Sequence, residues 1–317
     1  MPDKSPKDQN SPRVSIIMLN WNQMEVTSDC LNSLEHISYP NFEVLVVDQA
    51  SDNQEGRELQ KRFPWIQIIQ SESNLGFTGG NNLALQQSTG ELVLLLNNDT
   101  EVPTGFLEPL VHAFQSDPRL GITSPKILYF QTANLIQYAG CDDLNPYTMR
   151  GSTRGYHEID EGQHDEARFV HFAHGAAMMI RSDVFKEIGL LADQFFVYYE
   201  ELDFCKRARA AGWSIKYVPE SNVFHKESVT MGKNSPSKTY FMTRNRIMYL
   251  RRNCTLFPKM IALGFVCGIA LPFHWVRFIL TRQFKHSAAL LKGAMWHTTH
   301  FNVQQNSYLT RNPEVPA

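Results

Sequence analysis

Three polar residues, Asn97, Asn98 and Asp99, directly follow an apolar run that ends at Leu96. A carboxylate at the end of a strand can bind a divalent cation through one oxygen and leave other coordination positions to phosphate oxygens and water. Asn and Asp are also common turn residues, so the triplet is compatible with a plain strand-to-helix turn. His225, at the end of another predicted strand, is a second candidate metal ligand, although a lone histidine is more often structural. These residues indicate a candidate metal and phosphate site without deciding it.

Three carboxylates, Glu200, Glu201 and Asp203, stand in the first turn of a helix that we predict over Glu200–Ala211. Acidic residues at a helix start are stabilised by the helix dipole, so capping alone could explain them. The residues that precede them are largely aromatic, namely Phe195, Phe196, Tyr198 and Tyr199. Aromatic neighbours favour a partly dry site in which one carboxylate could act as a base.

A glycine-rich segment, Asn74–Asn82, precedes another predicted helix and contains Gly79, Asn81 and Asn82. Glycines permit a close approach of the backbone, and a helix start offers free N–H groups to an anion. The segment has neither the dinucleotide spacing nor the Lys-Ser/Thr pair of a P-loop. By itself it is a glycine-bearing turn.

Apolar runs alternate with helical segments over about the first hundred residues. The predicted strands are Val14–Leu19, Phe42–Asp48, Ile66–Ile69 and Glu91–Leu96. This alternation predicts a doubly wound α/β sheet, in which ligands bind at the carboxyl ends of the strands. Polar residues gather at those ends, at Asn20 and Asn22, Asp48–Asp52 and Asn97–Asp99. We therefore expect a ligand site along this edge.

The second half of the α/β region is less regular. Cys141–Arg168 is poor in aliphatic residues and is predicted to be a long loop, and loops of that length are often functional. Phe169–Ile180 returns to strand character. Two further short strands are predicted at Trp213–Val218 and Asn222–His225.

Beyond Lys233 the chain becomes apolar and basic. Tyr240–Leu250 is predicted to be helical, and Met260–Leu280 is about long enough to cross a bilayer. Pro272 and Arg277 interrupt this stretch, and a second amphipathic piece follows over Phe284–Trp296. The pattern favours a pair of helices at a membrane surface. A spanning helix and a helical cap on the α/β domain stay open.

The composition is that of a folded globular protein, with 317 residues, 43% hydrophobic and 20% charged. The 30 basic and 32 acidic side chains leave no large cationic excess, so we expect no nucleic-acid partner. Five scattered cysteines without a C-x-x-C pair favour a reduced, cytosolic chain. Residues 1–12 are polar and are predicted to be a disordered tail, neither signal peptide nor anchor.

Taken in order, these segments resemble the family 2 glycosyltransferases of the GT-A fold. The resemblance extends over about Arg13 to Arg252. The matching segments are V-S-I-I-M-L-N-W-N at Val14–Asn22, V-V-D-Q-A-S-D at Val46–Asp52, N-L-G-F-T-G-G-N-N at Asn74–Asn82, L-L-L-N-N-D-T at Leu94–Thr100, H-G-A-A-M-M-I-R at His174–Arg181, Y-E-E-L-D-F-C at Tyr199–Cys205, A-G-W at Ala211–Trp213 and T-R-N-R at Thr243–Arg246.

The resemblance implies a GT-A domain over residues 13–232, a mixed nucleotide-binding sheet flanked by helices. A helical, membrane-associated region over 233–317 would follow it. The implied reaction moves a sugar from a nucleotide-diphosphate donor to an acceptor hydroxyl, with inversion at the anomeric carbon.

Site residues carried over by position form three groups. The implied nucleotide and donor residues are Asn20, Asp48, Asp52, Gly79, Asn81, Asn82, Asn97 and Asn98. The donor-sugar or acceptor region would contain His174, Gly175, Asp203 and Arg244. Asp99 and His225 would hold a divalent cation, Mg²⁺ or Mn²⁺, and Asn97 takes the place of the first acid of the family's D-x-D-type motif.

The catalytic base in relatives is the second acid of an acidic pair at the helix start, which is Glu201 here. Most relatives have Asp at that position, so this chain departs by one methylene. We prefer Glu201, and Glu200 stays open as the alternative base.

The branch that this chain resembles contains rhamnosyl-, galactofuranosyl- and N-acetylhexosaminyltransferases of surface-polysaccharide assembly. A dTDP- or UDP-sugar donor, a saccharide or lipid-linked saccharide acceptor, and a position at the cytoplasmic face of the cell membrane are the corresponding expectations. Two alternatives stay open. One is an inactive nucleotide-sugar-binding module, and the other is a nucleotidyltransferase, which is disfavoured because Asn20–Gln23 contains no Lys or Arg.

Overall fold

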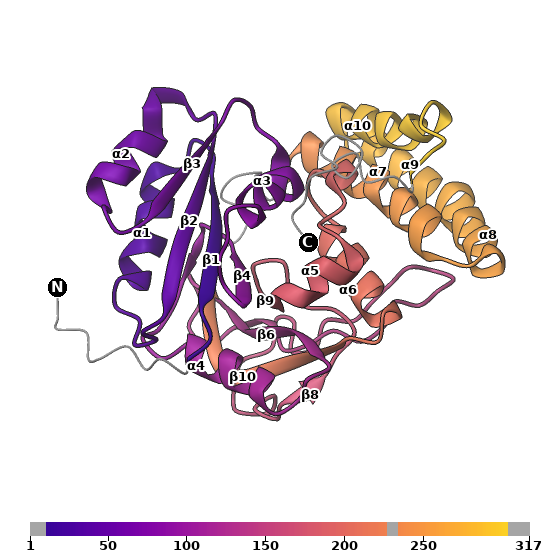
Figure 1. Cartoon of the computed structure of the whole chain (residues 1–317). Helices are drawn as coiled ribbons and strands as arrows, with labels where there is room; N and C mark the ends of the chain where they lie inside the picture. Colours follow the sequence, from indigo (N-terminus) through magenta and orange to yellow (C-terminus); the bar gives the residue numbers. More distant parts are fainter. Residues whose placement is uncertain (1–10, 227–233, 304–317) are drawn as a thin grey trace.

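The structure, a computed structural model, describes residues 11–226 and 234–303. The tail expected over residues 1–12 lies outside the described residues except for its last two positions. The expected boundary between the two regions, at residues 232–233, lies outside them as well. Figure 1 shows an α/β part that ends with strand β10 and a group of helices at one side of it.

The N-terminal half of the sheet is parallel, in the order β3-β2-β1-β4. The bounds of these strands are Val14–Asn20 (β1), Phe42–Gln49 (β2), Gln67–Ser71 (β3) and Leu92–Leu96 (β4). All five residues of β4 are buried, as expected for a strand inside a sheet whose two faces are both covered. The four strands predicted from the apolar runs are therefore present, within a few residues of their predicted ends.

The C-terminal half makes the sheet mixed. It contains β5 (Thr100–Glu101), β6 (Leu120–Tyr129), β7 (Ile136–Tyr138), β8 (Arg168–Phe169), β9 (Ala177–Arg181) and β10 (Ser214–His225). Strand β9 lies between β4 and β6 and is antiparallel to both, whereas β10 is parallel to β6. The short strand β5 pairs antiparallel with the end of β10.

Two details differ from the sequence-based expectation. The two short strands expected near Trp213–His225 form the single strand β10, whose pairing with β6 shifts register between Val218 and Asn222. Pro219 lies in this interval and has no backbone N–H to donate, which explains the interruption. The strand expected over Phe169–Ile180 is reduced to the end of β8 and most of β9, with non-strand backbone between them.

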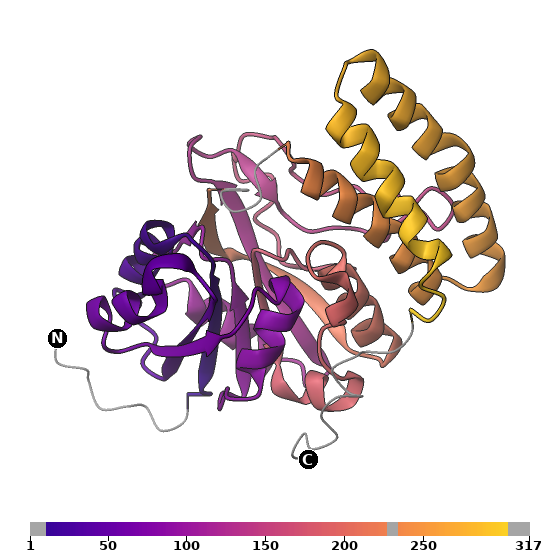
Figure 2. The ribbon, with the colours of Figure 1, turned by 90° about the horizontal axis from the view of Figure 1, so that it is seen from above.

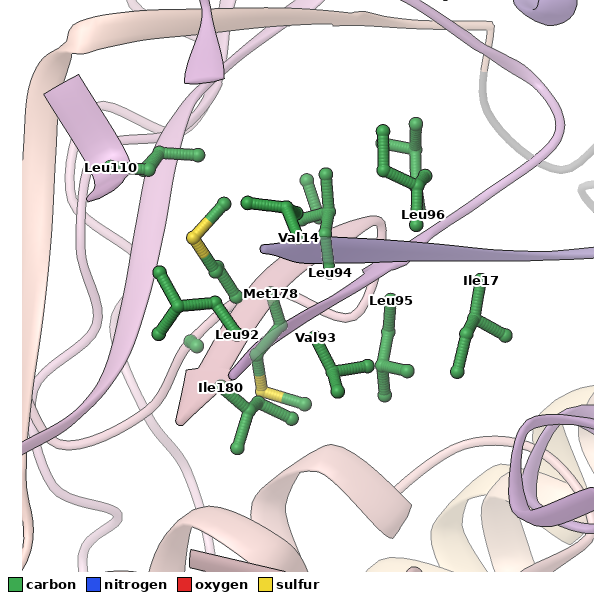
Figure 3. Close-up of a cluster of buried hydrophobic side chains, with 14 of the residues drawn as sticks. Val14, Ile17, Leu92, Val93, Leu94, Leu95, Leu96, Leu110, Met178 and Ile180 are labelled. Carbon is green, nitrogen blue, oxygen red and sulfur yellow. The ribbon is translucent and has the colours of Figure 1, made fainter. Parts of the chain in front are cut away.

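Helices pack on the sheet, and apolar side chains fill the interface. The helices of this part are α1 (Met24–Leu34), α2 (Glu55–Arg62), α3 (Gly76–Leu85), α4 (Leu107–Gln115), α5 (Ser182–Ile188) and α6 (Glu200–Ala210), with short 3-10 helices at Asp52–Gln54 and Asp193–Phe195. Figure 3 shows part of the core, where aliphatic side chains of β1 and β4 meet Met178 and Ile180 of β9 and Leu110 of α4. This core holds the strand ends, and the side chains that follow them, in fixed positions.

The remaining helices form a separate group, visible beside the α/β part in both views (Figures 1 and 2). Their bounds are α7 (Pro236–Asn253), α8 (Leu256–Phe265), α9 (Leu271–Leu280) and α10 (Phe284–Met295), with a 3-10 turn at Trp296–Thr298. A π-helical turn over Val266–Ala270 joins α8 to α9, so Pro272 does not end the helix. Among the described residues, Leu256–Leu280 is the one helix long and apolar enough to cross a membrane, with a mean hydropathy of 1.8 in its most apolar window, of which only 11% is buried.

Candidate active site

A cavity of about 640 Å³ opens at the carboxyl ends of β1 and β4 and at the start of α6. Residues from nine separate parts of the sequence line it. Of the catalytic, binding and metal residues predicted from the sequence, those that line the cavity are Asn81, Asn97, Asn98, Asp99, His174, Gly175, Glu200, Glu201 and His225. The metal-binding candidates and the candidate bases therefore face one common space.

Asp99 and His225 are brought together by strand pairing. Thr100 of β5 is the register partner of His225 in β10, so the residue before Thr100 lies beside the imidazole. Nε2 of His225 lies 3.1 Å from Oδ1 of Asp99, and both side chains are buried. Nδ1 of His225 lies 2.7 Å from Oε1 of Gln137, a residue of β7.

This arrangement fits a bound cation. Because the Oε1 atom of Gln137 can only accept, Nδ1 of His225 carries a proton, and Nε2 faces the Asp99 carboxylate. Two electron-rich atoms 3.1 Å apart are stabilised when a cation or a proton lies between them. A carboxylate and an imidazole are suitable ligands for Mn²⁺ and related divalent ions.

Further ligands must come from outside this pair. Within residues 11–226 and 234–303, no group of three or more His, Cys, Asp or Glu side chains is placed to hold a metal ion. Asn97 lines the cavity and is neutral. Phosphate oxygens of a substrate and water are the ligands that would complete such a site.

Glu200 and Glu201 line the same cavity, but their surroundings differ. Glu200 is 5% exposed, and burial together with the charge of Glu201 raises the pKa of Glu200 well above its ordinary value. Burial also raises the pKa of Glu201, while backbone N–H groups at Tyr199, Glu201 and Leu202 stabilise its charged form. Of the two residues, Glu200 therefore favours the protonated form more strongly, and Glu201 is the one that more readily carries the negative charge.

The start of α6 is held by a strained backbone. Phe196, Tyr198 and Tyr199 all have positive φ angles, of 65°, 69° and 72°, which residues other than glycine rarely adopt. The side-chain amide of Asn245 donates to the carbonyl oxygens of Phe195, Val197 and Tyr198, at 2.7–2.9 Å. Asn245, in the T-R-N-R segment of α7, thus fixes the turn that presents the two glutamates.

His174 lies between the two halves of the site, with its ring centroid 6.1 Å from that of His225. Its Nδ1 accepts a hydrogen bond from the N–H of Ala176 at 3.1 Å, so Nε2 carries the proton. Burial, reinforced by the nearby His225, lowers the pKa of His174 to about 3, and the ring is neutral at physiological pH. At Gly175, a Cβ atom would lie 3.8 Å from Cγ of Glu201, so this backbone directly faces the glutamate.

Asn20 and Asp48 do not line the cavity but form a buried network behind it. The Asn20 amide donates to Oδ1 of Asp48 at 3.0 Å, and its Oδ1 accepts from Thr27 at 2.7 Å. Thr27 in turn accepts from the Asn98 amide at 2.9 Å. The ends of β1, β2 and β4 are therefore tied together, which positions Asn98 and the neighbouring Trp21 on the cavity wall.

Three other residues predicted to bind the donor also lie off the cavity lining. Asp52 is exposed to solvent at the end of the segment after β2. Gly79 belongs to α3, and a Cβ atom there would lie 2.8 Å from Cβ of Leu75, the N-cap residue of that helix. Asn82 is fully buried, and its amide both donates to and accepts from the backbone of Leu191. A side chain whose polar atoms are bound to the backbone in the core cannot contact a ligand in the cavity, so Asn82 is a structural residue.

Asp203 and Arg244, predicted in the donor-sugar or acceptor region, also point elsewhere. Asp203 lies 2.9 Å from Nε of Arg207 and 2.9 Å from Nε of Arg252, so it joins α6 to α7. Nη2 of Arg244 donates to the carbonyl oxygens of Gln194 and Phe195. Both are buried and hold the elements around the site rather than lining it.

Asp203→Asn is expected to lower the free energy of unfolding by about 3–5 kcal/mol, because it removes the buried negative charge that pairs with Arg207 and Arg252. Burial alone would raise the pKa of Asp203, but Arg207 and Arg252 outweigh it and lower that pKa. This stabilisation is therefore present above the unfolded pKa of about 3.9 and is lost as the pH falls through the lower folded value. Urea unfolding at pH 7 and at acidic pH measures both effects.

The control for this substitution is Asp183→Asn, which removes an exposed ion pair with Lys186 and should cost at most about 1 kcal/mol. Equal costs for the two substitutions would contradict the structural role of Asp203.

Several residues of the site could not be singled out from the sequence. Gln137 lies in a three-residue strand without a recognisable pattern, and Lys238 and Phe241 precede the T-R-N-R segment. Phe196 packs against Gly76, where a Cβ atom would meet the Phe196 ring at 2.5 Å. For Phe196 and Tyr198, the one indication in the sequence was that they belong to the aromatic run before Glu200 and Glu201.

The family model for glycosyl transferase family 2 matches residues 15–189, more than half of the chain. The chain therefore belongs to glycosyl transferase family 2, and its activity is glycosyl transfer. This membership favours glycosyl transfer over the nucleotidyltransferase alternative.

Two relatives show where in the family the similarity lies. The chain is 28% identical over 294 residues to the low-salt glycan biosynthesis hexosyltransferase Agl10 of Haloferax volcanii, covering 89% of this chain and 90% of that protein. It is 26% identical over 216 residues to the N-acetylglucosaminyl-diphospho-decaprenol L-rhamnosyltransferase of Mycobacterium tuberculosis, covering 61% and 69%.

Solved structures share the fold. GalNAc-T7, crystallised with UDP, GalNAc and Mn²⁺, superposes with a TM-score of 0.58 at 16% identity, over 76% of this chain and 51% of that one. The mannosyltransferase PcManGT of Pyrobaculum calidifontis, in complex with GDP-Man and Mn²⁺, gives a TM-score of 0.55 at 15% identity, over 95% and 91%. This likeness confirms the predicted GT-A fold.

Proposed function

We propose that the protein is an inverting, metal-dependent glycosyltransferase that moves a hexosyl or deoxyhexosyl group from a nucleotide-diphosphate donor to an acceptor hydroxyl. The observation that carries the proposal is the single cavity lined by the Asp99–His225 pair and by Glu201. Such a cavity can receive a diphosphate at one wall and an acceptor hydroxyl at another.

Glu201 acts as the general base. It accepts the proton of the acceptor hydroxyl while that oxygen forms a bond to the anomeric carbon. The bond from this carbon to the diphosphate oxygen breaks on the opposite face, so one displacement inverts the configuration. Glu200, as the neutral member of the pair, adds no second negative charge beside the attacking oxygen.

Asp99 and His225 would hold the cation, whose contribution when bound is to neutralise charge on the departing diphosphate. Gln137 keeps His225 in the tautomer with a free Nε2. His174 can donate from Nε2 to a donor oxygen without carrying a charge. The amides of Asn81, Asn97 and Asn98 supply further hydrogen bonds, and Trp21 offers an apolar face to the nucleoside.

A UDP- or dTDP-sugar is the proposed donor, and a saccharide on a lipid carrier is the proposed acceptor, in surface polysaccharide or glycolipid assembly. The exposed apolar helix Leu256–Leu280 supports contact with a membrane surface, at its cytoplasmic face. The mycobacterial relative is named for a diphospho-decaprenol substrate, which also supports a lipid-linked acceptor.

Thermal unfolding with a panel of nucleotide sugars tests the donor. A true donor present at 100 times its Kd stabilises the native state by about 2.7 kcal/mol, because it binds the folded protein alone. With Mn²⁺ present we expect one sugar of the UDP or dTDP series to raise Tm by several degrees, and EDTA to remove most of the shift. Release of the nucleotide from that sugar then measures turnover. A panel in which no nucleotide sugar shifts Tm contradicts the proposal.

A further inference from the structure

A second cavity of about 640 Å³ lies between α7 and the helices α9 and α10. We call it the basic cavity, because its lining includes five lysine, arginine and histidine side chains: Lys238, Arg246, His274, Arg277 and His286. No carboxylate lines it within the described part of the chain. The sequence explains this imbalance, because no Asp or Glu occurs between Glu227 and Glu314.

The walls of the basic cavity are firmly placed. Oγ1 of Thr239 on α7 lies 2.8 Å from Nδ1 of His286 on α10. Gly293 brings α10 onto α7, since a Cβ atom there would lie 2.7 Å from the Tyr240 carbonyl oxygen. The cavity is therefore part of the folded helical group seen in Figure 2.

The positive charges of the basic cavity are not neutralised by carboxylates among its described lining residues. The buried Nε of Arg246 has no hydrogen-bond partner among the described residues. Nη2 of the same guanidinium donates to the carbonyl oxygen of Thr148, a neutral acceptor that does not cancel its positive charge. Burial and the charges of Arg277, Arg246 and Arg150 hold the pKa of His274 below its ordinary value, as expected where positive potential is concentrated. These observations point to an anionic ligand.

The position of the basic cavity relates this anion to the reaction. Lys238 lines both the basic cavity and the cavity that contains Glu201. Tyr199, directly before the two glutamates, also lines the basic cavity. A molecule with a phosphate in the basic cavity can thus extend past Lys238 and present a hydroxyl to Glu201.

The surface around the cavity indicates what else the ligand carries. Large apolar side chains stand exposed on α8, α9 and α10, of which the last two line the cavity: Leu256, Phe257, Met260, Phe273, Trp275, Val276, Leu280, Phe284 and Met295. Exposed apolar side chains with basic neighbours are typical of a surface that contacts lipid. A phosphate attached to a hydrocarbon chain satisfies both features.

We propose that the basic cavity is the subsite for the phosphate or diphosphate group of a prenyl-linked acceptor, whose hydrocarbon chain leaves along the exposed apolar side of α8 and α9. This inference rests on the proposed function, because it assigns the acceptor of that reaction. Arg277 and His286 contact the phosphate oxygens, and Lys238 lies between the phosphate and the reacting sugar.

Binding of farnesyl diphosphate to the full-length protein in EDTA tests the subsite without any turnover. Arg277 is exposed, so Arg277→Gln leaves the fold intact, and it is expected to weaken binding about tenfold or more through the loss of a hydrogen bond to a charged group. Lys285→Gln is the matched control, since it removes the same charge from a residue of α10 outside the cavity lining, and binding should stay within about twofold. Asp99→Asn should also bind as the wild type does.

Three results would overturn the assignment. In the first, Arg277→Gln binds farnesyl diphosphate as tightly as Lys285→Gln does. In the second, Asp99→Asn loses binding, which places the probe in the donor cavity. In the third, inorganic pyrophosphate competes as tightly as farnesyl diphosphate, which removes the lipid from the proposal. None of these depends on a nucleotide sugar, so failure here is distinguishable from failure of the proposed transfer reaction.

Discussion

Glu201→Gln is expected to lower the rate of nucleotide release from the donor sugar by about 10²–10⁴-fold, the usual contribution of a general base. Glutamine keeps the shape of the side chain and its place opposite Gly175, but it cannot accept the proton. Donor binding should change little, because the donor contacts that we propose lie on the other wall of the cavity. The measurement is nucleotide release under saturating donor, with water or an added acceptor taking the sugar.

Glu200→Gln is the matched control. Burial and the neighbouring charge keep the pKa of Glu200 well above its ordinary value, so the neutral glutamine mimics its native state. We expect less than about tenfold loss, by contrast with the loss of the base itself. If Glu200→Gln is inactive and Glu201→Gln is active, the two roles are reversed.

The pH profile adds a separate test of the base. Burial raises the pKa of Glu201, and a base must be unprotonated to act. Activity should therefore fall as the pH drops through a value above the ordinary glutamate pKa of about 4.3. This acidic limb should disappear from the residual activity of Glu201→Gln. A limb that persists unchanged in the variant assigns the titration to another group.

Asp99→Asn is expected to reduce nucleotide release by about 10²–10³-fold and to abolish its dependence on Mn²⁺. A cation contributes several kcal/mol to a developing anion, and each 1.36 kcal/mol corresponds to a factor of ten in rate. EDTA should inactivate the wild type to a similar extent, and added Mn²⁺ should restore it. The same response to Mn²⁺ in Asp99→Asn would exclude this residue as a ligand.

Gln137→Leu tests whether Asp99 and His225 bind a metal ion or only stabilise the fold. It removes the acceptor of the His225 Nδ1 proton while leaving both proposed ligands in place. Loss of such a partner typically weakens metal affinity about 10–100-fold. We expect a higher Mn²⁺ requirement with nearly full activity at saturation, and an unchanged requirement would mean that Gln137 does not orient the ligand.

Local patterns carried much of the prediction. The aliphatic runs of β1, β2 and β4 are buried on both faces, so each of these runs alone identifies a strand, and the alternation with helices identifies the parallel sheet. The polar residues after the strands could be assigned to one edge for the same reason. The ordered motifs extended this assignment to family 2 of the glycosyltransferases, which the family model confirms.

Other features depend on contacts between residues far apart in the chain. Asp203 and Arg244 stand in motifs that also contain site residues, yet ion pairs and backbone carbonyls draw both side chains away from the cavity. Gln137 meets His225 only because β6 lies between their strands.

The amino-acid sequence by itself determined the strands, the edge at which polar groups gather and the residue types available for chemistry, because these follow from hydrophobic period and local turn chemistry. Only the tertiary structure decided which of these groups share a cavity and which of them are bound to the core. It also collected the basic side chains of three helices around one space. The physical reason is that a side chain's role depends on burial and on partners, and packing sets both.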